Sequence, residues 1–483
     1  MSQAFAGKTV AIVGMARTGM AAAEVLSKLG ARVILFDRKP AVELERELDE
    51  ARRLGVEARP GHPGADLDGV DVLVPSPGVP AASPIFGDAL GRRVEIMSEI
   101  ELAYRISNAP IVAITGTNGK TTTAVLTGGI MEADGWETYI AGNVAAGELK
   151  LPLVKAAHQA SENAVIVAEV STFQLEWVSS FRPKVAALLN VGGDHLDRHT
   201  PEEYVSLKSR VFHYQTPDDY AVVNADNAAS AALGERVRAK RLEFSRLRQV
   251  EHGAFLDGGS VRVRIDGCEF VACTLDDIAA SGNLPGTHSQ ENVLAATCAA
   301  AAFAVRPESI ARAVREFAGV EHRMERVATI GGVEYINNSM CTNADAFVRS
   351  VEAVGGPAVV IAGGKYKSHS LQPVAEAVRD HARHLVLIGV SAPDIEKAVR
   401  SAGFSDITRS DSMEEAVRAA AAVAQPGDTV ILAPACASFD MFRSFEERGQ
   451  VFKDAVRRIQ ESGFRIEGRN CECCPEQGGE DDP

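Results

Sequence analysis

The sequence lacks any apolar run long enough to cross a membrane. The longest nearly unbroken run, Val293 to Val305, is shorter than the roughly 20 residues that a membrane-spanning helix needs, and it is typical of a buried helix. The first residues also lack the basic and apolar segments of a secretory signal, and they lead directly into a strand pattern. We therefore expect a cytoplasmic protein without a membrane span.

Positive charge and disulfide-forming patterns are also scarce. The chain has 50 lysines and arginines against 65 aspartates and glutamates, a net charge of −15, which argues against bulk binding of nucleic acid or an anionic membrane. An anionic substrate must then be held by a local site. Disulfides are not expected in a reducing compartment, and the tail thiols Cys471, Cys473 and Cys474 have no histidine beside them, so we expect no functional metal there.

At 483 residues the chain is too long for one core, and its strand and helix patterns alternate in three segments. We predict an α/β fold of three domains: an N-terminal Rossmann-like domain over 1–108, a central P-loop-type ATPase sheet over 109–320, and a C-terminal Rossmann-like domain over 321–466. Residues 253–273 alternate apolar and polar side chains around glycine turns, which predicts a small antiparallel insertion in the central domain. Residues 467–483 are expected to form a flexible, cysteine-rich tail.

The first segment opens with a strand, a glycine turn, a helix and a second strand, the pattern of a βαβ unit. Compared with the dinucleotide fingerprint G-x-G-x-x-G it has Gly14, Ala16 and Gly19, and Asp37 stands near the distance expected for a ribose-binding carboxylate. Because an alanine replaces the middle glycine, the pattern favours a nucleotide site more than an NAD site. A second turn, VPSPGVP, follows another strand and is expected to border the same crevice.

The stretch AITGTNGKTTT is similar to a phosphate-binding loop with one glycine displaced. The pattern G-x-x-x-x-G-K-[ST] requires glycine where Ile114 stands, and Gly116 is the additional glycine instead. A buried strand, a tight turn, and Lys120 and Thr121 at a helix N-terminus remain. Such a helix end favours an anion, the lysine can reach phosphates, and the threonine hydroxyl can ligate Mg²⁺. The alternative is an ordinary strand–turn–helix corner with a solvated lysine.

Two side chains follow neighbouring strands of the central segment. Glu169 ends the strand AVIVAEV, and His195 follows the strand VAALLN. Ligands of open α/β sheets bind at the carboxyl ends of strands, so we expect Thr121, Glu169 and His195 to hold a metal ion around a nucleotide triphosphate. Taken alone, His195 is interpreted as a solvated loop histidine, and Lys208 in YVSLKSRVF as a solvated helix lysine.

The loop TGTNGKTT resembles the phosphate loop of the Mur ligase family, ATP-dependent enzymes that add amino acids to the peptidoglycan precursor. Six further motifs occur in the family's order over nearly the whole chain: EVSTFQLE, NVGGDHLDRH, GVEHRMERV, INNSMCTN, AGGKYKS and LAPACASFDMFRSFEERG. The resemblance is closer to members that join glutamate, with the D-isomer favoured, to UDP-N-acetylmuramoyl-L-alanine. It implies ATP, Mg²⁺ at two sites, and a monomer that binds small molecules but neither nucleic acid nor membrane.

The resemblance also implies roles for single residues. ATP would contact Gly116, Thr117, Asn118, Gly119, Lys120, Thr121, Thr122, Asn292, Arg323 and Asn338. The UDP-linked substrate would contact Gly14, Arg17, Thr18, Gly19, Asp37, Arg38, Gly78 and Asn143, and the incoming glutamate would contact Thr342, Lys367, Ser438 and Phe445. The implied metal ligands are Thr121, Glu169, His195 and Lys208, and the implied catalytic residues are Lys120, Glu169, His195, Lys208 and Arg323. Lys208 would act after carbamylation by CO₂, because an ammonium cannot ligate Mg²⁺ and a carbamate oxygen can.

The chain departs from the family pattern at the acceptor motif. Members usually read Asp-Ser-Lys-x-Thr-Asn where this chain has Asn338, Ser339, Met340, Cys341, Thr342 and Asn343, so one carboxylate and one cation are missing. A same-family ligase with another acceptor, such as L-glutamate or the substrate of folylpolyglutamate synthase, therefore remains open. From other classes, a nucleotide-binding dehydrogenase or a non-catalytic nucleotide-binding module would fit Gly14, Gly19 and Asp37.

The implied reaction activates a carboxylate as an acyl phosphate, which the amine of the incoming amino acid then displaces. The acyl phosphate must be kept from water, which predicts closure of the third domain over the central one. Asp194 and His195 are both candidates to deprotonate the amine.

Overall fold

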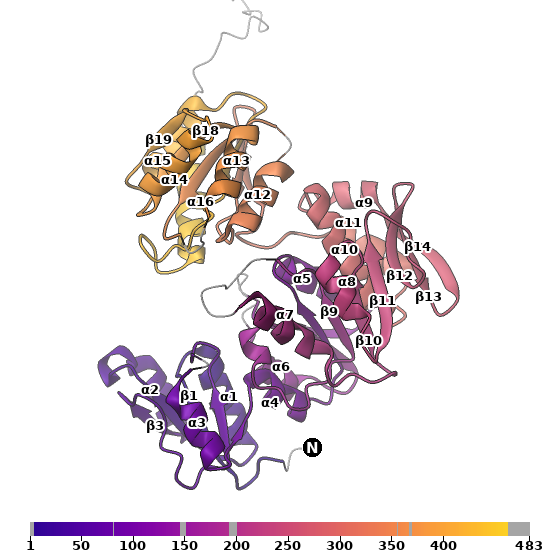
Figure 1. The fold of residues 1–483 in the computed structure, drawn as a ribbon, viewed down its shortest axis with the longest axis vertical. Coiled ribbons are helices and arrows are strands. Elements are labelled where there is room, and N and C mark those ends of the chain that lie inside the picture. Colours follow the sequence, from indigo (N-terminus) through magenta and orange to yellow (C-terminus); the bar gives the residue numbers. More distant parts are fainter. Residues whose placement is uncertain are drawn as a thin grey trace, which may run out of the picture. The chain divides into compact units, whose positions relative to one another are not determined.

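The computed structural model describes residues 4–80, 82–144, 151–192, 200–354, 356–366 and 370–461. Over these residues the chain is a mixed α/β protein built on three separate sheets (Figure 1). It divides into two compact units, Met1–Glu321 and His322–Pro483. The first unit contains two sheets and the second contains one, which confirms the predicted α/β fold class. Among the described helices, none combines the length and the apolar composition that a membrane span requires.

The first sheet is parallel throughout and has the strand order β3-β2-β1-β4-β5. Its elements are β1 (Thr9–Val13), α1 (Arg17–Lys28), β2 (Arg32–Asp37), η1 (Ala41–Glu43), α2 (Glu45–Leu54), β3 (Glu57–Pro60), β4 (Val72–Pro75), α3 (Pro84–Gly91), β5 (Glu95–Ile96) and α4 (Glu99–Ile106). Strand side chains alternate between the faces, so Val10 and Ile12 pack with α1 whereas Ala11 packs with α3. The strand order reverses between β1 and β4, and the turns that follow these two strands therefore lie side by side.

The second sheet has the order β14-β13-β12-β11-β10-β9-β6-β8-β7. Its strands are β6 (Ile111–Thr115), β7 (Glu137–Gly142), β8 (Ala164–Glu169), β9 (Val185–Leu188), β10 (Tyr220–Asn224), β11 (Lys240–Ser245), β12 (Gly253–Asp257), β13 (Ser260–Ile265) and β14 (Cys268–Thr274). Its helices are α5 (Lys120–Ala133), α6 (Leu153–Gln159), η2 (Phe173–Leu175), α7 (Pro201–Ser209), η3 (Arg210–Phe212), α8 (Ala228–Gly234), α9 (Leu275–Ala280), α10 (Gly286–Ala301) and α11 (Pro307–Arg315). Alternate residues of β6 again face opposite helices: Val112 and Ile114 pack with α5 and α10, and Ile111 and Ala113 pack with α6.

The predicted antiparallel meander is present as β12, β13 and β14. It continues the central sheet, because β12 pairs in parallel with β11. Gly253 makes this pairing possible: its φ is +128°, and a Cβ atom there would lie 1.9 Å from the carbonyl oxygen of Glu243. Residues 293–301 of the apolar run predicted to be a buried helix form the buried second half of α10, and residues 302–305 follow the end of this helix.

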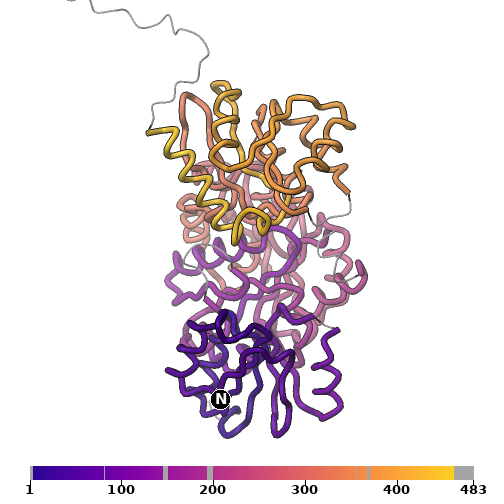
Figure 2. The backbone as a smooth tube through the Cα atoms, turned by 90° about the vertical axis from the view of Figure 1, so that its left-hand side faces the viewer, coloured from indigo at the N-terminus to yellow at the C-terminus, as the bar shows by residue number. Residues whose placement is uncertain are grey.

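The first two sheets share one hydrophobic core in which α1, α4 and α6 meet. Figure 2 shows the N-terminal segment lying against the start of the central segment within this unit. Polar contacts add to the packing. Lys155 of α6 pairs with Glu24 of α1 at 2.6 Å, and the buried carboxylate of Glu101 accepts hydrogen bonds of 2.9–3.0 Å from the backbone N–H groups of residues 179–181. The boundary at residue 108 remains a prediction, since the core runs across it.

The second unit contains a sheet of order β15-β16-β20-β17-β18-β19, parallel except for the β15–β16 pair. Its elements are β15 (Glu325–Ile330), β16 (Val333–Asn337), α12 (Ala344–Ala353), β17 (Ala358–Gly363), α13 (Gln372–His381), β18 (Ala382–Ile388), α14 (Ala392–Ser401), β19 (Ile407–Arg409), α15 (Met413–Val423), β20 (Thr429–Leu432) and α16 (Phe445–Glu461). Val360 packs with α12 and α13, whereas Val359 and Ile361 pack with α15 and α16. Helices thus cover both faces of this sheet, as in a Rossmann-like domain.

Candidate active site

The loop between β6 and α5 has the backbone of an anion-binding turn. Gly116 and Gly119 have φ angles of +155° and +85°, and a Cβ atom on Gly119 would lie 2.3 Å from Asn292 Oδ1 of α10. Helix α5 begins at Lys120, so its first N–H groups have no partner within the helix and point toward the loop. Three threonines at its start, Thr121, Thr122 and Thr123, are buried.

Asn190, two residues after the end of β9, holds this loop in shape. Its Oδ1 accepts a hydrogen bond from Asn118 N at 2.8 Å, its Nδ2 donates to Asn118 O at 3.2 Å, and its own carbonyl accepts from Thr117 N at 3.0 Å. Lys120 Nζ donates to the carbonyl oxygens of Gly116 and Thr117 at 3.0 and 2.9 Å. The sequence analysis missed Asn190, although a polar residue at the end of an apolar strand was a signal for it.

Glu169, at the carboxyl end of β8, lies beside the start of α5. Thr121 Oγ1 donates to its Oε2 at 2.7 Å and Asn143 Nδ2 donates to its Oε1 at 3.0 Å. The side chain is 3% exposed, and no lysine or arginine in the described parts of the chain pairs with it. A buried carboxylate that has only neutral donors is costly, and a hard cation would offset that cost. Carboxylate and hydroxyl oxygens are also the ligands that Mg²⁺ prefers, so the residues fit this ion.

Lys208 of α7 is buried, with 2% exposure, which is not the solvated helix lysine that the sequence alone favours. Its Nζ lies 4.5 Å from the ring centroid of Tyr204. The Tyr204 hydroxyl is 3.3 Å from Thr117 Oγ1, so Tyr204 connects Lys208 to the phosphate loop. Tyr204 was missed from the sequence. His195 lies outside the described residues.

The turn after β1 also requires glycine at two positions. Gly14 has φ of +104° and lies beside the second turn, where Ser76 Oγ donates to the Gly14 carbonyl at 3.4 Å. A Cβ atom on Gly19 would lie 1.9 Å from the same carbonyl oxygen, so α1 can pack this closely on the turn only with glycine.

Asp37, at the end of β2, connects the turn after β1 with the turn after β2. Its Oδ2 accepts from Met15 N at 2.8 Å and its Oδ1 accepts from Lys39 N at 3.0 Å. The other residues predicted to bind the UDP-linked substrate lie on the same edge of the sheet: Arg17 and Thr18 in the first turn of α1, Arg38 after β2, and Gly78 after β4.

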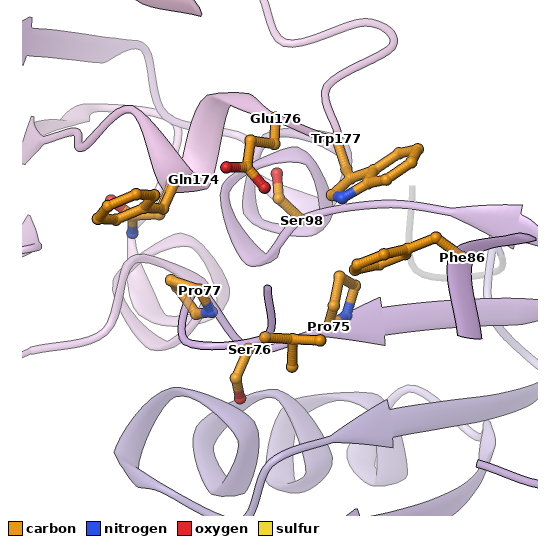
Figure 3. Close-up of a pocket in the computed structure, with 10 residues that line it drawn as sticks. Pro75, Ser76, Pro77, Phe86, Ser98, Gln174, Glu176 and Trp177 are labelled. Atoms are coloured by element: carbon orange, nitrogen blue, oxygen red, sulfur yellow. The ribbon is translucent and has the colours of Figure 1, made fainter. Parts of the chain in front are cut away.

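A small pocket lies where the turn after β4 meets the segment after β8 (Figure 3). Its cavity of about 10 Å³ has room for a single water molecule. Trp177 stacks on Phe86, with ring centroids 4.8 Å apart, and Figure 3 shows Glu176 and Ser98 beside the indole. The ends of strands from two sheets therefore border one region of the first unit.

In the second unit, two residues of the acceptor motif contact residues outside it. Arg323 Nη2 lies 2.9 Å from the sulfur of Met340. Asn338 Nδ2 donates to Ser350 Oγ at 2.6 Å, and its Oδ1 accepts from Met324 N at 3.2 Å. Both ends of the Asn338 amide are thus used inside this unit, and its proposed nucleotide contact remains a prediction.

Arg448 of α16, missed from the sequence, joins the loops after β16 and β20. It is 1% exposed, and it donates to Ser339 Oγ at 3.0 Å, to Ser339 O at 2.8 Å and to Cys436 O at 3.1 Å. Desolvation lowers the pKa of Arg448 to about 10. Ser339 Oγ in turn donates to Phe445 O at 2.7 Å. The predicted acceptor residues Thr342, Ser438 and Phe445 belong to these loops and the start of α16, whereas Lys367 lies outside the described residues.

A glycine-containing phosphate loop at the carboxyl edge of a parallel sheet, beside a buried carboxylate suited to a cation, defines a nucleotide-dependent α/β enzyme. Comparison with known proteins agrees. The Mur ligase middle domain matches residues 114–300, and the Mur ligase glutamate ligase domain matches residues 322–436.

Two relatives illustrate the similarity along the whole chain. The UDP-N-acetylmuramoylalanine–D-glutamate ligase of Pelotomaculum thermopropionicum is 42% identical over 462 residues, which cover 95% of this chain and 100% of the relative. The ligase of the same name from Clostridioides difficile is 38% identical over 457 residues, which cover 94% and 99%. The chain belongs to the Mur ligase family and is an ATP-dependent, amide-bond-forming ligase.

Solved structures support the fold. The UDP-N-acetylmuramate–alanine ligase of Thermotoga maritima has a TM-score of 0.58 at 18% identity, covering 94% of this chain and 99% of that chain. A pseudomurein peptide ligase type C from Methanothermus fervidus has a TM-score of 0.57 at 18% identity, covering 94% and 100%. The dehydrogenase alternative is wrong for this chain, because the family match and the relatives identify a ligase.

Proposed function

We propose that the chain joins D-glutamate to UDP-N-acetylmuramoyl-L-alanine at the expense of ATP, as a cytoplasmic, monomeric enzyme of peptidoglycan precursor synthesis. The observation that carries this proposal is the cluster beside the phosphate loop in which buried Thr121 and exposed Asn143 both donate to buried Glu169. Glu169 is the carboxylate of this cluster that would bind a cation. It ends β8, and the segment after β8 borders the turn after β4, which lies beside the turn after β1. The names of the relatives support glutamate as the amino acid.

Phosphate binding depends on the loop itself. The N–H groups at the start of α5 and the ammonium of Lys120 hold the phosphates of ATP, and Arg323 contributes its planar, always-charged donor group. Glu169 and Thr121 would hold one Mg²⁺, and His195 with carbamylated Lys208 would hold a second. When bound, Mg²⁺ neutralises charge on the phosphate oxygens. The chain's contribution is positioning and charge neutralisation, which are the main requirements of phosphoryl transfer.

The reaction proceeds in two steps. An oxygen of the alanine carboxylate attacks the γ-phosphorus, and the bond to the β–γ bridging oxygen breaks to release ADP. The glutamate nitrogen, having lost its proton, then attacks the carbonyl carbon of the acyl phosphate, and inorganic phosphate leaves. Thr342, Lys367, Ser438 and Phe445 are proposed to hold the glutamate, because each of its carboxylates needs a partner once it leaves water.

Carbamylation of Lys208 is supported by its burial and by its contact with Tyr204 beside the phosphate loop. Mass spectrometry of the active enzyme under bicarbonate should show the added CO₂. An unmodified amine in an active preparation would rule the carbamate out.

The test of the function is ATP turnover by the purified chain. Release of ADP and phosphate should require Mg²⁺, UDP-N-acetylmuramoyl-L-alanine and D-glutamate together. ATP turnover that does not depend on the UDP-linked acid would contradict the proposal.

A further inference from the structure

Glu99, the first residue of α4, is a buried carboxylate that the mechanism above does not use. It is 2% exposed, and its Oε1 accepts a hydrogen bond of 2.7 Å from the backbone N–H of Val154 in the first turn of α6. The residue before that helix is Pro152, which offers no capping side chain. Glu99 therefore satisfies an N–H group of α6 from a different helix.

The same side chain reaches the segment after β8. The Gln174 amide lies beside Glu99 and lowers the pKa of its carboxyl, while Gln174 Oε1 accepts from the backbone N–H and the hydroxyl of Ser171 at 3.0 and 2.9 Å. The residue before Glu99 makes a second link, because Ser98 N donates to Trp177 O at 2.8 Å. The segment 171–177 thus contacts Glu99 of α4 beside Gln174 and the preceding Ser98 at Trp177.

The surroundings of Glu99 bring the pKa of its carboxyl close to neutral pH. Desolvation raises the pKa of Glu99 to about 7, and this rise is limited by hydrogen bonds from Val154 and Gln174 and by the positive charge of Arg17 on α1. The other charged groups on the elements packed here are Lys155 of α6, which pairs with Glu24 of α1, Glu101 of α4, which pairs with Arg105, and Glu176 of the segment 171–177.

We propose that Glu99 is a positioning residue for the UDP-linked substrate, whose carboxylate holds the segment 171–177 and the start of α6 in place beside the turn that carries Arg17. This inference rests on the proposed function, which puts that substrate along Arg17, Asn143 and the end of β8. Glu169 stands two residues before the segment 171–177. Leu151, two residues before α6, accepts a hydrogen bond of 2.9 Å from the N–H of Gly142, which is next to Asn143, so both structures that Glu99 holds adjoin the site. Protonation removes the carboxylate's charge and weakens the hydrogen bond that it accepts from Val154 N.

The test compares Glu99→Gln with the parent enzyme in steady-state assays between pH 6 and pH 8. The KM of the parent for UDP-N-acetylmuramoyl-L-alanine should rise roughly tenfold as pH falls from 8 to 6, which is the change expected for one group that titrates near pH 7. The variant should have a KM raised roughly tenfold at pH 8, comparable to the loss of one charge-assisted hydrogen bond, and this KM should not vary with pH. The KM for ATP and kcat should be unchanged.

Glu101→Gln is the matched control, since Glu101 is a second buried carboxylate on the same helix. Burial raises its pKa, but hydrogen bonds from Ser180, Arg105 and Ser179 outweigh this and leave the pKa lowered, so Glu101 stays charged between pH 6 and pH 8. The control should lose thermal stability and keep the parent's KM profile.

A Glu99→Gln enzyme with the parent's KM profile, or with equal losses for both substrates, would overturn the inference while leaving the proposed function intact. A parent enzyme that does not turn over ATP with the UDP-linked acid would overturn both. If Glu99→Gln does not fold, the Gln174→Met variant tests the inference instead. This change removes the hydrogen bonds between Gln174 and Ser171 and keeps the hydrogen bond from Val154 N to Glu99. That variant should raise the same KM, and a parental KM would refute the role of Glu99.

Discussion

At the scale of single residues, Lys120 shows how the loop is prepared for a phosphate. Its ammonium donates to two loop carbonyls, Gly116 O and Thr117 O, and these oxygens are weaker partners than phosphate oxygens. We expect Lys120→Ala to lower kcat by roughly 100-fold or more, because the ammonium acts on charge that develops during phosphoryl transfer. Its melting temperature should stay close to the parent's, and near-normal turnover would contradict the phosphate-loop assignment.

Glu99 has a second, independent consequence for stability. Its pKa in the folded protein, about 7, is above the ordinary value of 4.5, so the folded state binds the proton more tightly than the unfolded state does. Raising the pH from 5 to 8 should therefore lower the parent's stability relative to Glu99→Gln, by about 3 kcal/mol from the size of the shift. Both tryptophans, Trp136 and Trp177, lie in the first unit, so urea unfolding followed by their fluorescence measures this difference. An equal pH dependence in the two proteins would contradict it.

At the scale of elements, Arg448 connects α16 with the loops after β16 and β20. Arg448→Met should lower the free energy of unfolding of the second unit by about 3 kcal/mol, because it leaves buried carbonyls at Ser339 and Cys436 without their donor. Arg457→Met is the control on the same helix, since its side chain is 58% exposed and should change stability by no more than about 0.5 kcal/mol. Hydrogen exchange of the second unit's strands measures both, and equal effects would show that the buried contacts are unimportant.

The loop after β16 should control the choice of amino acid. Met340 stands 2.9 Å from Arg323, so a lysine at this position would add a second cation beside the guanidinium and attract an acceptor carboxylate. We expect Met340→Lys to lower the KM for D-glutamate and to increase discrimination against L-glutamate. Initial rates with D-glutamate, L-glutamate, D-aspartate and diaminopimelate measure this. A preference for diaminopimelate over both glutamate isomers would show that the acceptor assignment is wrong.

At the scale of the whole molecule, the chain consists of two compact units with separate cores. The first two sheets share a core through α1, α4 and α6, so a fragment of residues 1–321 should fold by itself, unfold cooperatively and bind UDP-N-acetylmuramoyl-L-alanine in calorimetry. It should not form product, because Arg323 and the proposed acceptor residues belong to the second unit. An unfolded fragment, or one with ligase activity, would contradict this division.

The α/β class, the phosphate loop and the buried helix α10 could be predicted from the sequence because each depends on neighbours in the chain. Alternating apolar residues define a strand, and a glycine turn followed by lysine and threonine defines the loop, whatever the rest of the protein does. The placement of Glu169 beside Thr121 also followed, since parallel strands bring their carboxyl ends to one edge.

Other features depend on contacts between residues far apart in the chain, which no local pattern contains. Asn190 is 72 residues from the loop it holds, and Arg448 is 109 residues from Ser339. The contact of Tyr204 with Thr117, 87 residues away, and the connection from Glu99 to α6 likewise arise only when separate elements pack together. Periodicity indicates which face of an element is buried. Only the packing of separate elements determines which polar groups contact that face, and therefore whether a charged side chain is solvated or belongs to the site.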